Sequence, residues 1–207
     1  MPNTNIRFTR QTTPNMNNTT PKFLYHYYEL AKGPFRNISN VEYDKAQKII
    51  SEVSVGFNKN RDPKYLDLRL ELEVKLKNAF IAKGGRPTRN DPFYFTLGEC
   101  KWLETWFGET GIVKMPLSIF EKQSEIVSIT HPDSMISYQM AEFEILKDKR
   151  KPCNGKVFTI DELEELVSNY GVPTAEQWKN EPAYIYDRYI EVQIWDFEPI
   201  QKYLDSI

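Results

Sequence analysis

One strand-like segment near the C-terminus reads Arg188-Tyr189-Ile190-Glu191-Val192-Gln193-Ile194-Trp195. Because side chains alternate between the two faces of a strand, its residues separate into two sets. One face is aliphatic: Ile190, Val192, Ile194. The other carries a carboxylate, an amide and an indole: Glu191, Gln193, Trp195. The aliphatic face predicts a core, and the second face is either a solvated surface or the wall of a site.

A second aromatic strand lies near the N-terminus and reads Phe23-Leu24-Tyr25-His26-Tyr27-Tyr28, with one of only two histidines in the chain. Two interpretations of His26 are open. A backbone carbonyl holds its half-buried ring, or the ring donates a hydrogen bond to a ligand hydroxyl, since a neutral imidazole has one donor and one acceptor.

Helices and strands alternate between these two segments. Apolar spacing, caps and breakers predict helices over 41–53, 62–83, 99–107 and 161–170, and strands over 93–96, 111–115 and 125–130. Residues 137–146 fit a strand or hairpin arm, and their period is ambiguous. On the long helix, four charged side chains are expected to be solvated: Glu71, Glu73, Lys75, Lys77. Since the order is not strictly βαβ, we predict a single α+β domain over 22–207, with a mixed, mostly antiparallel sheet and flanking helices.

Composition limits the remaining classes. Residues 1–21 are rich in Asn, Thr and Pro, so burial cannot offset their ordering entropy and we predict a flexible N-terminal arm. A net charge of -2 argues against a nucleic-acid coat protein, although a local basic patch can still bind a nucleic-acid substrate. Cys100 and Cys153 lack metal-ligand spacing and are expected to be reduced thiols. No apolar run approaches the ~20 residues of a membrane span, and no signal peptide is visible, so we expect a cytoplasmic protein.

The chain lacks a glycine-rich phosphate loop, a dinucleotide fingerprint and a nucleophile elbow. Two distant histidines also argue against a histidine-based metal centre. Glu191 is either a cross-strand partner of Lys or Arg, or a carboxylate that stabilises developing positive charge. Arg36 and Arg86, in loops, have the planar guanidinium that suits bidentate phosphate binding. Tyr94 offers an aromatic face for stacking.

Three short pieces carry a family resemblance. Leu24-Tyr25-His26-Tyr27 resembles the first motif of ADP-ribosyltransferases of the His-Tyr-Glu type, and Phe93-Tyr94-Phe95-Thr96 resembles the second. Glu191 is placed like the catalytic glutamate. The resemblance is nearest to the DNA-modifying toxin (DarT-like) branch, and the chain also looks like small bacterial and phage proteins.

The resemblance implies NAD as a substrate and ADP-ribose transfer to a nucleic-acid or protein acceptor. His26 would hold the adenosine-side ribose, and Tyr94 would stack on the leaving nicotinamide. Arg36 or Arg86 would bind the pyrophosphate, and Glu191 would stabilise the cation that forms on the ribose. This hypothesis requires His26, Tyr94 and Glu191 to share one cleft.

Two other hypotheses compete with this one. The chain is a non-catalytic interaction protein, such as a bacterial or phage inhibitor or an antitoxin-like binder, whose aromatic residues anchor a partner. Alternatively it processes nucleic acid with magnesium held by Asp133, Glu142 and Glu144, of which the last two share a face if their segment is extended.

Overall fold

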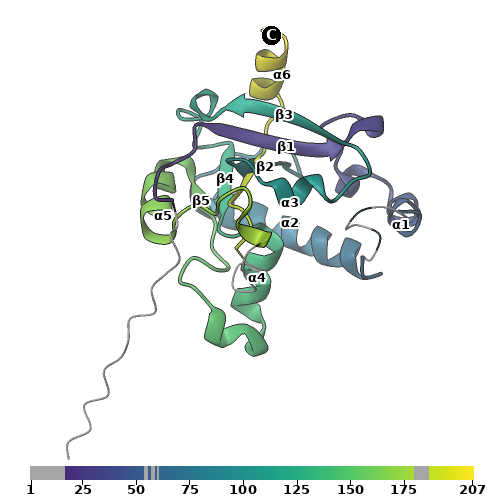
Figure 1. Ribbon diagram of the computed structural model, residues 1–207, viewed down its shortest axis with the longest axis horizontal. Coiled ribbons are helices and arrows are strands. Elements are labelled where there is room, and N and C mark those ends of the chain that lie inside the picture. Colours follow the sequence, from purple (N-terminus) through teal and green to yellow (C-terminus); the bar gives the residue numbers. More distant parts are fainter. Residues whose placement is uncertain (1–16, 54–55, 57–58, 60, 180–186) are drawn as a thin grey trace, which may run out of the picture.

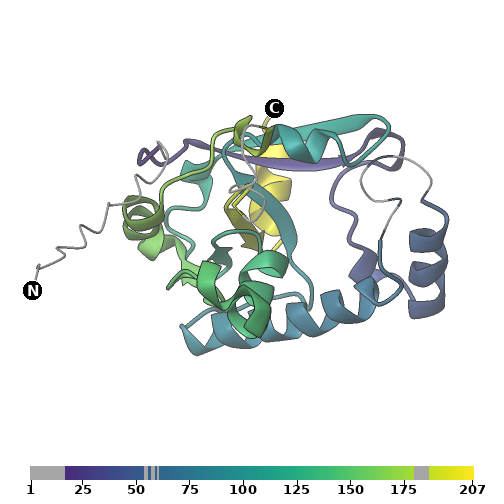
Figure 2. The ribbon, with the colours of Figure 1, turned by 60° about the horizontal axis from the view of Figure 1, so that its bottom comes forward.

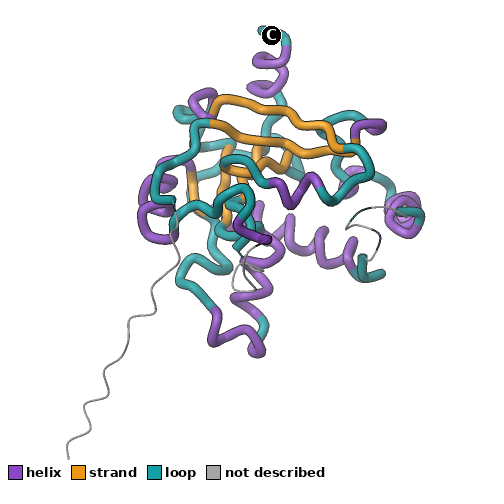
Figure 3. Tube along the Cα trace, in the orientation of Figure 1, coloured by secondary structure: helices purple, strands orange, loops and turns teal. Residues whose placement is uncertain are grey.

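Glu191 lies on a central strand of an antiparallel sheet. The structure, a computed structural model, describes residues 17–53, 56, 59, 61–179 and 187–207. In these residues six strands form one sheet in the order β3-β1-β2-β6-β4-β5, and every pair is antiparallel (Figure 3). The strands are β1 (Phe23–Glu29), β2 (Phe93–Leu97), β3 (Thr110–Pro116), β4 (Val127–Thr130), β5 (Phe158–Thr159) and β6 (Glu191–Ile194). The predicted α+β class is confirmed.

Helices lie on both sides of this sheet. They are α1 (Tyr43–Ser51), α2 (Tyr65–Ala82), α3 (Lys101–Glu104), α4 (Ser134–Glu142), α5 (Leu163–Tyr170) and α6 (Glu198–Leu204). Figure 1 shows α6 above the strands and α2 and α4 below them. Figure 2 shows α2 running lengthwise beneath the rest of the chain, with α4 close to it. No helix of the described residues is long and apolar enough to cross a membrane.

The strand registers define two faces of the sheet. Four residues form one row across it: Tyr25, Thr96, Glu191, Thr130. Directly opposed residues point to the same side, so these four share a face with their alternate neighbours Tyr94 and Gln193. We call this side the polar face. The other side, the apolar face, carries Leu24, His26, Phe95, Val192 and Ile129.

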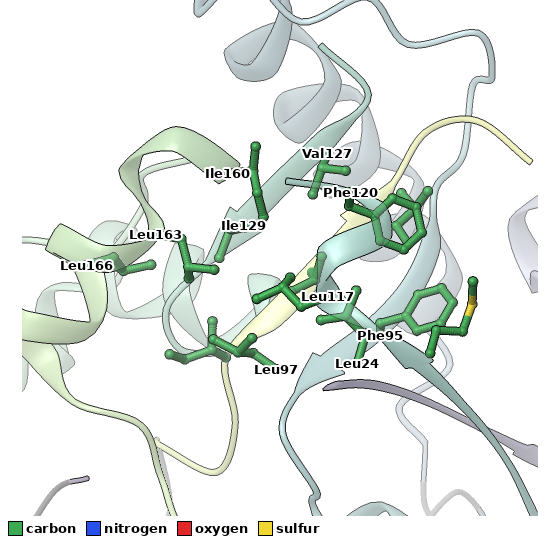
Figure 4. Close-up of a cluster of buried hydrophobic side chains, with 14 of the residues drawn as sticks. Leu24, Phe95, Leu97, Leu117, Phe120, Val127, Ile129, Ile160, Leu163 and Leu166 are labelled. Carbon is green, nitrogen blue, oxygen red and sulfur yellow. The ribbon is translucent and has the colours of Figure 1, made fainter. Parts of the chain in front are cut away.

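The main core lies on the apolar face. Side chains of β1, β2, β4 and β6 pack there against Leu163, Leu166 and Val167 of α5 and Ile200 of α6 (Figure 4). The local signals for this helical segment are present as predicted. Thr159 and Glu162 form a capping box at the start of the 3-10 helix Ile160–Glu162, which leads into α5, and Gly171 ends α5 with a φ of 71°.

The polar face is covered by α2 and α4. Phe80 of α2 stacks on Trp195, with ring centroids 6.2 Å apart. The segment expected to be extended at 137–146 is instead α4 followed by a 3-10 helix, Glu144–Lys149. Asp133 explains the difference, since its Oδ1 accepts a hydrogen bond from Ile136 N at 3.1 Å and so caps α4.

Two further expectations differ from the structure. Glu73 was expected to be solvated, yet it is only 3% exposed because α2 turns this side toward the sheet. The predicted arm covers 1–21, of which 1–16 lie outside the described residues. Within 17–21, Asn17 O accepts a hydrogen bond from Val172 N at 2.8 Å, so this part is attached to the domain rather than free.

Candidate functional site

Glu191 is a fixed, buried carboxylate on the polar face. Glu191 is only 7% exposed. Its Oε1 accepts hydrogen bonds from Ser134 N at 3.3 Å and from Gln193 Nε2 at 2.9 Å. Neither donor is a Lys or Arg, so the solvated cross-strand ion pair considered for Glu191 is wrong. Burial raises the pKa of Glu191, and these two donors oppose that rise.

A relay of hydrogen bonds holds Gln193 in one orientation. Trp195 Nε1 donates to Ser128 Oγ at 2.8 Å, and Ser128 Oγ donates to Gln193 Oε1 at 2.8 Å. The Gln193 amide then donates to Thr130 Oγ1 at 3.0 Å and to Glu191. Both the oxygen and the nitrogen of this amide form hydrogen bonds, so the relay holds Gln193 in the orientation in which it donates to the Glu191 carboxylate. The alternation Glu191, Gln193, Trp195 was the sequence signal for it.

Asp133 is the second carboxylate of the site. It is 8% exposed and precedes Ser134, whose backbone N–H binds Glu191. Burial, together with the negative charge of Glu191, raises the pKa of Asp133 to about 7. Asp133 therefore exchanges a proton near neutral pH, which an isolated surface aspartate does not do.

A buried arginine cluster borders Glu191 on the side of α2. Arg69 Nε lies 3.1 Å from Glu73 Oε1, and the Arg69 guanidinium carbon lies 4.5 Å from the centre of the Tyr94 ring. The Tyr94 hydroxyl donates to Glu73 Oε1 at 2.8 Å. Burial raises the pKa of Tyr94 well above its usual value, so the phenol stays neutral. Arg69 also favours the charged form of Glu191. No sequence pattern distinguishes Arg69 from the other charged residues of α2.

Arg188 supplies a second positive charge, on the side of Asp133. Its guanidinium carbon lies 3.8 Å from the centre of the Trp102 ring, and its buried Nε has no hydrogen-bond partner among the described residues. The charge of Arg188 acts on Asp133.

His26 does not join this site, so its assignment as a ribose-binding residue is wrong. Its side chain points to the apolar face, where the ring stacks on Phe35 at 4.8 Å. Both ring nitrogens are occupied: Nδ1 donates to Tyr94 O at 2.8 Å, and Nε2 accepts from Phe35 N at 2.9 Å. Burial lowers the pKa of His26. The interpretation with a backbone carbonyl is confirmed, and the shared parity of Leu24 and His26 was its signal.

The loop arginines also lie away from Glu191. Arg86 is 81% exposed and lies 3.7 Å from Glu125, beyond the Trp195 end of β6. Arg36 is exposed and follows Phe35, which packs on the apolar face. Among the described residues no contact links either arginine to Glu191 or Tyr94. The structure thus brings Glu191 and Tyr94 together on one face, and leaves His26, Arg36 and Arg86 elsewhere.

The proposed magnesium ligands are dispersed. Glu142 Oε1 accepts a hydrogen bond from Lys75 at 2.9 Å, and Glu144 Oε1 accepts one from Lys147 at 2.7 Å. Helix α4 ends between these two glutamates, so they do not share a strand face. No group of three or more His, Cys, Asp or Glu in the described part of the chain could hold a metal ion. Cys100 and Cys153 are free and buried.

Comparisons with known proteins add no relative. No family model, no curated protein and no solved structure matches the chain. The geometry of the polar face is therefore the basis on which a function can be inferred.

The pKa of Asp133 predicts a measurable effect on stability. Folding raises this pKa from its ordinary 3.8 to about 7, so the folded chain binds the proton more tightly. The contribution of Asp133 to stability therefore falls as pH rises between these values, and the full penalty is present above about pH 7. Asp133→Asn removes the penalty and keeps the helix cap. We expect the variant to be more stable than wild type at about pH 8, by up to about 4 kcal/mol, in urea unfolding.

The same comparison at about pH 4 is its control, because the advantage of Asp133→Asn should shrink as the pH approaches the unfolded pKa of 3.8. A variant that is less stable than wild type at the higher pH would show that the Asp133 carboxylate is stabilised by its surroundings.

Proposed function

We propose that the chain cleaves the nicotinamide–ribose bond of NAD and transfers ADP-ribose to a nucleic-acid or protein acceptor, with Glu191 as the catalytic carboxylate. The observation that carries this proposal is a buried carboxylate, fixed by two donors, beside an aromatic ring on the neighbouring strand. Breaking the bond builds positive charge on the ribose. A preorganised carboxylate stabilises that charge more in the transition state than in the ground state.

Register supports the pairing of Glu191 with Tyr94. Tyr94 lies opposite Gln193, and Glu191 lies opposite Thr96, so the two side chains are diagonal neighbours on one face. Diagonal neighbours are separated by about 7–8 Å, which a nicotinamide ring and its ribose can span. Arg69 covers one face of the Tyr94 ring, so nicotinamide would stack on the other face. His26 has no role in this proposal, because its side chain lies on the apolar face and not on the polar face with Glu191 and Tyr94.

Thermal unfolding with NAD tests binding. Because a ligand that binds only the folded state stabilises it, millimolar NAD should raise the unfolding midpoint of wild type. We expect a smaller rise for Tyr94→Leu, which loses the ring, and an unchanged rise for Arg86→Ala, which lies away from the site. An equal midpoint with and without NAD would contradict the proposal.

The non-catalytic alternative is favoured by a different observation. Phe143, which joins α4 to the following 3-10 helix, and Ile145, within that 3-10 helix, are 46% and 90% exposed. Exposed apolar side chains of this size can anchor a partner. A non-catalytic binder would keep partner binding in Glu191→Gln and lose it in Ile145→Asp. The enzymatic proposal predicts the reverse, with NAD turnover lost in Glu191→Gln and kept in Ile145→Asp.

A further inference from the structure

We propose that Asp133 is the general base of this site and that the acceptor is therefore a protic nucleophile, namely a hydroxyl group, an amide or water. This inference depends on the proposed cleavage of NAD, and it assigns the proton transfer to a residue that the family resemblance does not include. Glu191 alone would stabilise the cation, and Asp133 would activate the group that attacks it.

The geometry places Asp133 next to Glu191 with a fixed orientation. The two residues lie on different elements, and Ser134, which follows Asp133, donates its backbone N–H to Glu191 at 3.3 Å. The helix cap uses Oδ1 of Asp133, at 3.1 Å from Ile136 N, which leaves Oδ2 to exchange a proton. A base held by a helix terminus needs no reorganisation when the acceptor arrives.

The groups around Asp133 support this role. Four titratable groups interact with Asp133: Glu191 of β6, Tyr189 and Arg188 just before this strand, and Cys100 just before α3. Of these, Arg188 carries a positive charge. Burial and the charge of Glu191 raise the pKa of Asp133 to about 7, and Arg188 opposes this rise. A base whose pKa lies close to the working pH is the most efficient proton acceptor.

The step balances without a further reactant. The bond between the ribose anomeric carbon and the pyridinium nitrogen breaks, and its electron pair neutralises the ring, so nicotinamide leaves without needing a proton. The acceptor oxygen or nitrogen forms a bond to the anomeric carbon. The proton of that oxygen or nitrogen passes to the Asp133 carboxylate and then to solvent. Asp133 is thus needed for the acceptor and not for the leaving group.

Chemical rescue tests this assignment. We expect Asp133→Asn to lower NAD turnover by about 10²–10⁴-fold and to lose the rise of rate with pH near neutrality. Added azide, an anionic nucleophile that carries no proton, should restore turnover and yield ADP-ribosyl azide. Asp91→Asn is the matched control, because Asp91 is also buried but pairs with Arg89 away from this site.

Each outcome decides between the two proposals. A wild-type chain that neither binds nor consumes NAD removes both. If the wild type turns over NAD, and Asp133→Asn keeps full activity and an unchanged pH profile, Asp133 is not the general base. The proposed function then still stands. Activity that is lost in Asp133→Asn and not restored by azide shows a structural role for Asp133, and also overturns the inference.

Discussion

Glu191→Gln should lower NAD consumption by about 10²–10³-fold and leave the fold intact, because it removes the charge that stabilises the ribosyl cation. Glutamine has the same shape, and its carbonyl oxygen can accept the hydrogen bonds from Ser134 N and Gln193 Nε2. Stability should stay equal or rise, since burial disfavours the ionised carboxylate. Turnover is measured as release of nicotinamide, and stability by urea unfolding of the same preparations.

Glu125→Gln is a suitable control, because Glu125 is an exposed glutamate whose partner is Arg86. It should keep wild-type turnover. If Glu191→Gln also keeps wild-type turnover, the carboxylate is a structural part of the buried relay, and the catalytic proposal fails.

Arg69→Met should destabilise the chain by about 3–5 kcal/mol, because it leaves the buried Glu73 carboxylate without its positive partner. The double variant Arg69→Met/Glu73→Met removes both charges and should recover much of this loss. Denaturant unfolding of the single and double variants measures the coupling between the two residues.

Lys75→Met is the matched control on the same helix. Lys75 pairs with Glu71 at 3.0 Å and with Glu142 at 2.9 Å, both at the surface, where such pairs contribute little. If Arg69→Met costs no more than Lys75→Met, the Arg69 cluster does not hold α2 on the sheet.

Local patterns predicted much of the architecture. The alternation of apolar residues located β1, β2, β3 and β6, and the Thr159–Glu162 capping box located the start of α5. The segment 137–146 has an ambiguous period and was predicted to be extended. It is helical instead, because Asp133 caps α4 through the hydrogen bond from Ile136 N. The site was half predicted: Glu191 and Tyr94 share a face, whereas His26 points away from them.

The sequence by itself determined which residues alternate along each strand and which caps begin and end the helices, because these signals act over a few residues. Only the tertiary structure decided that both faces of β6 are buried, that Glu73 turns inward, and that Asp133 approaches Glu191. Ser134 and Glu191 are 57 positions apart. Such a contact depends on strand order and helix packing. The burial and the charge repulsion that raise the pKa of Asp133 exist only once the chain has folded and brought the two carboxyl groups together.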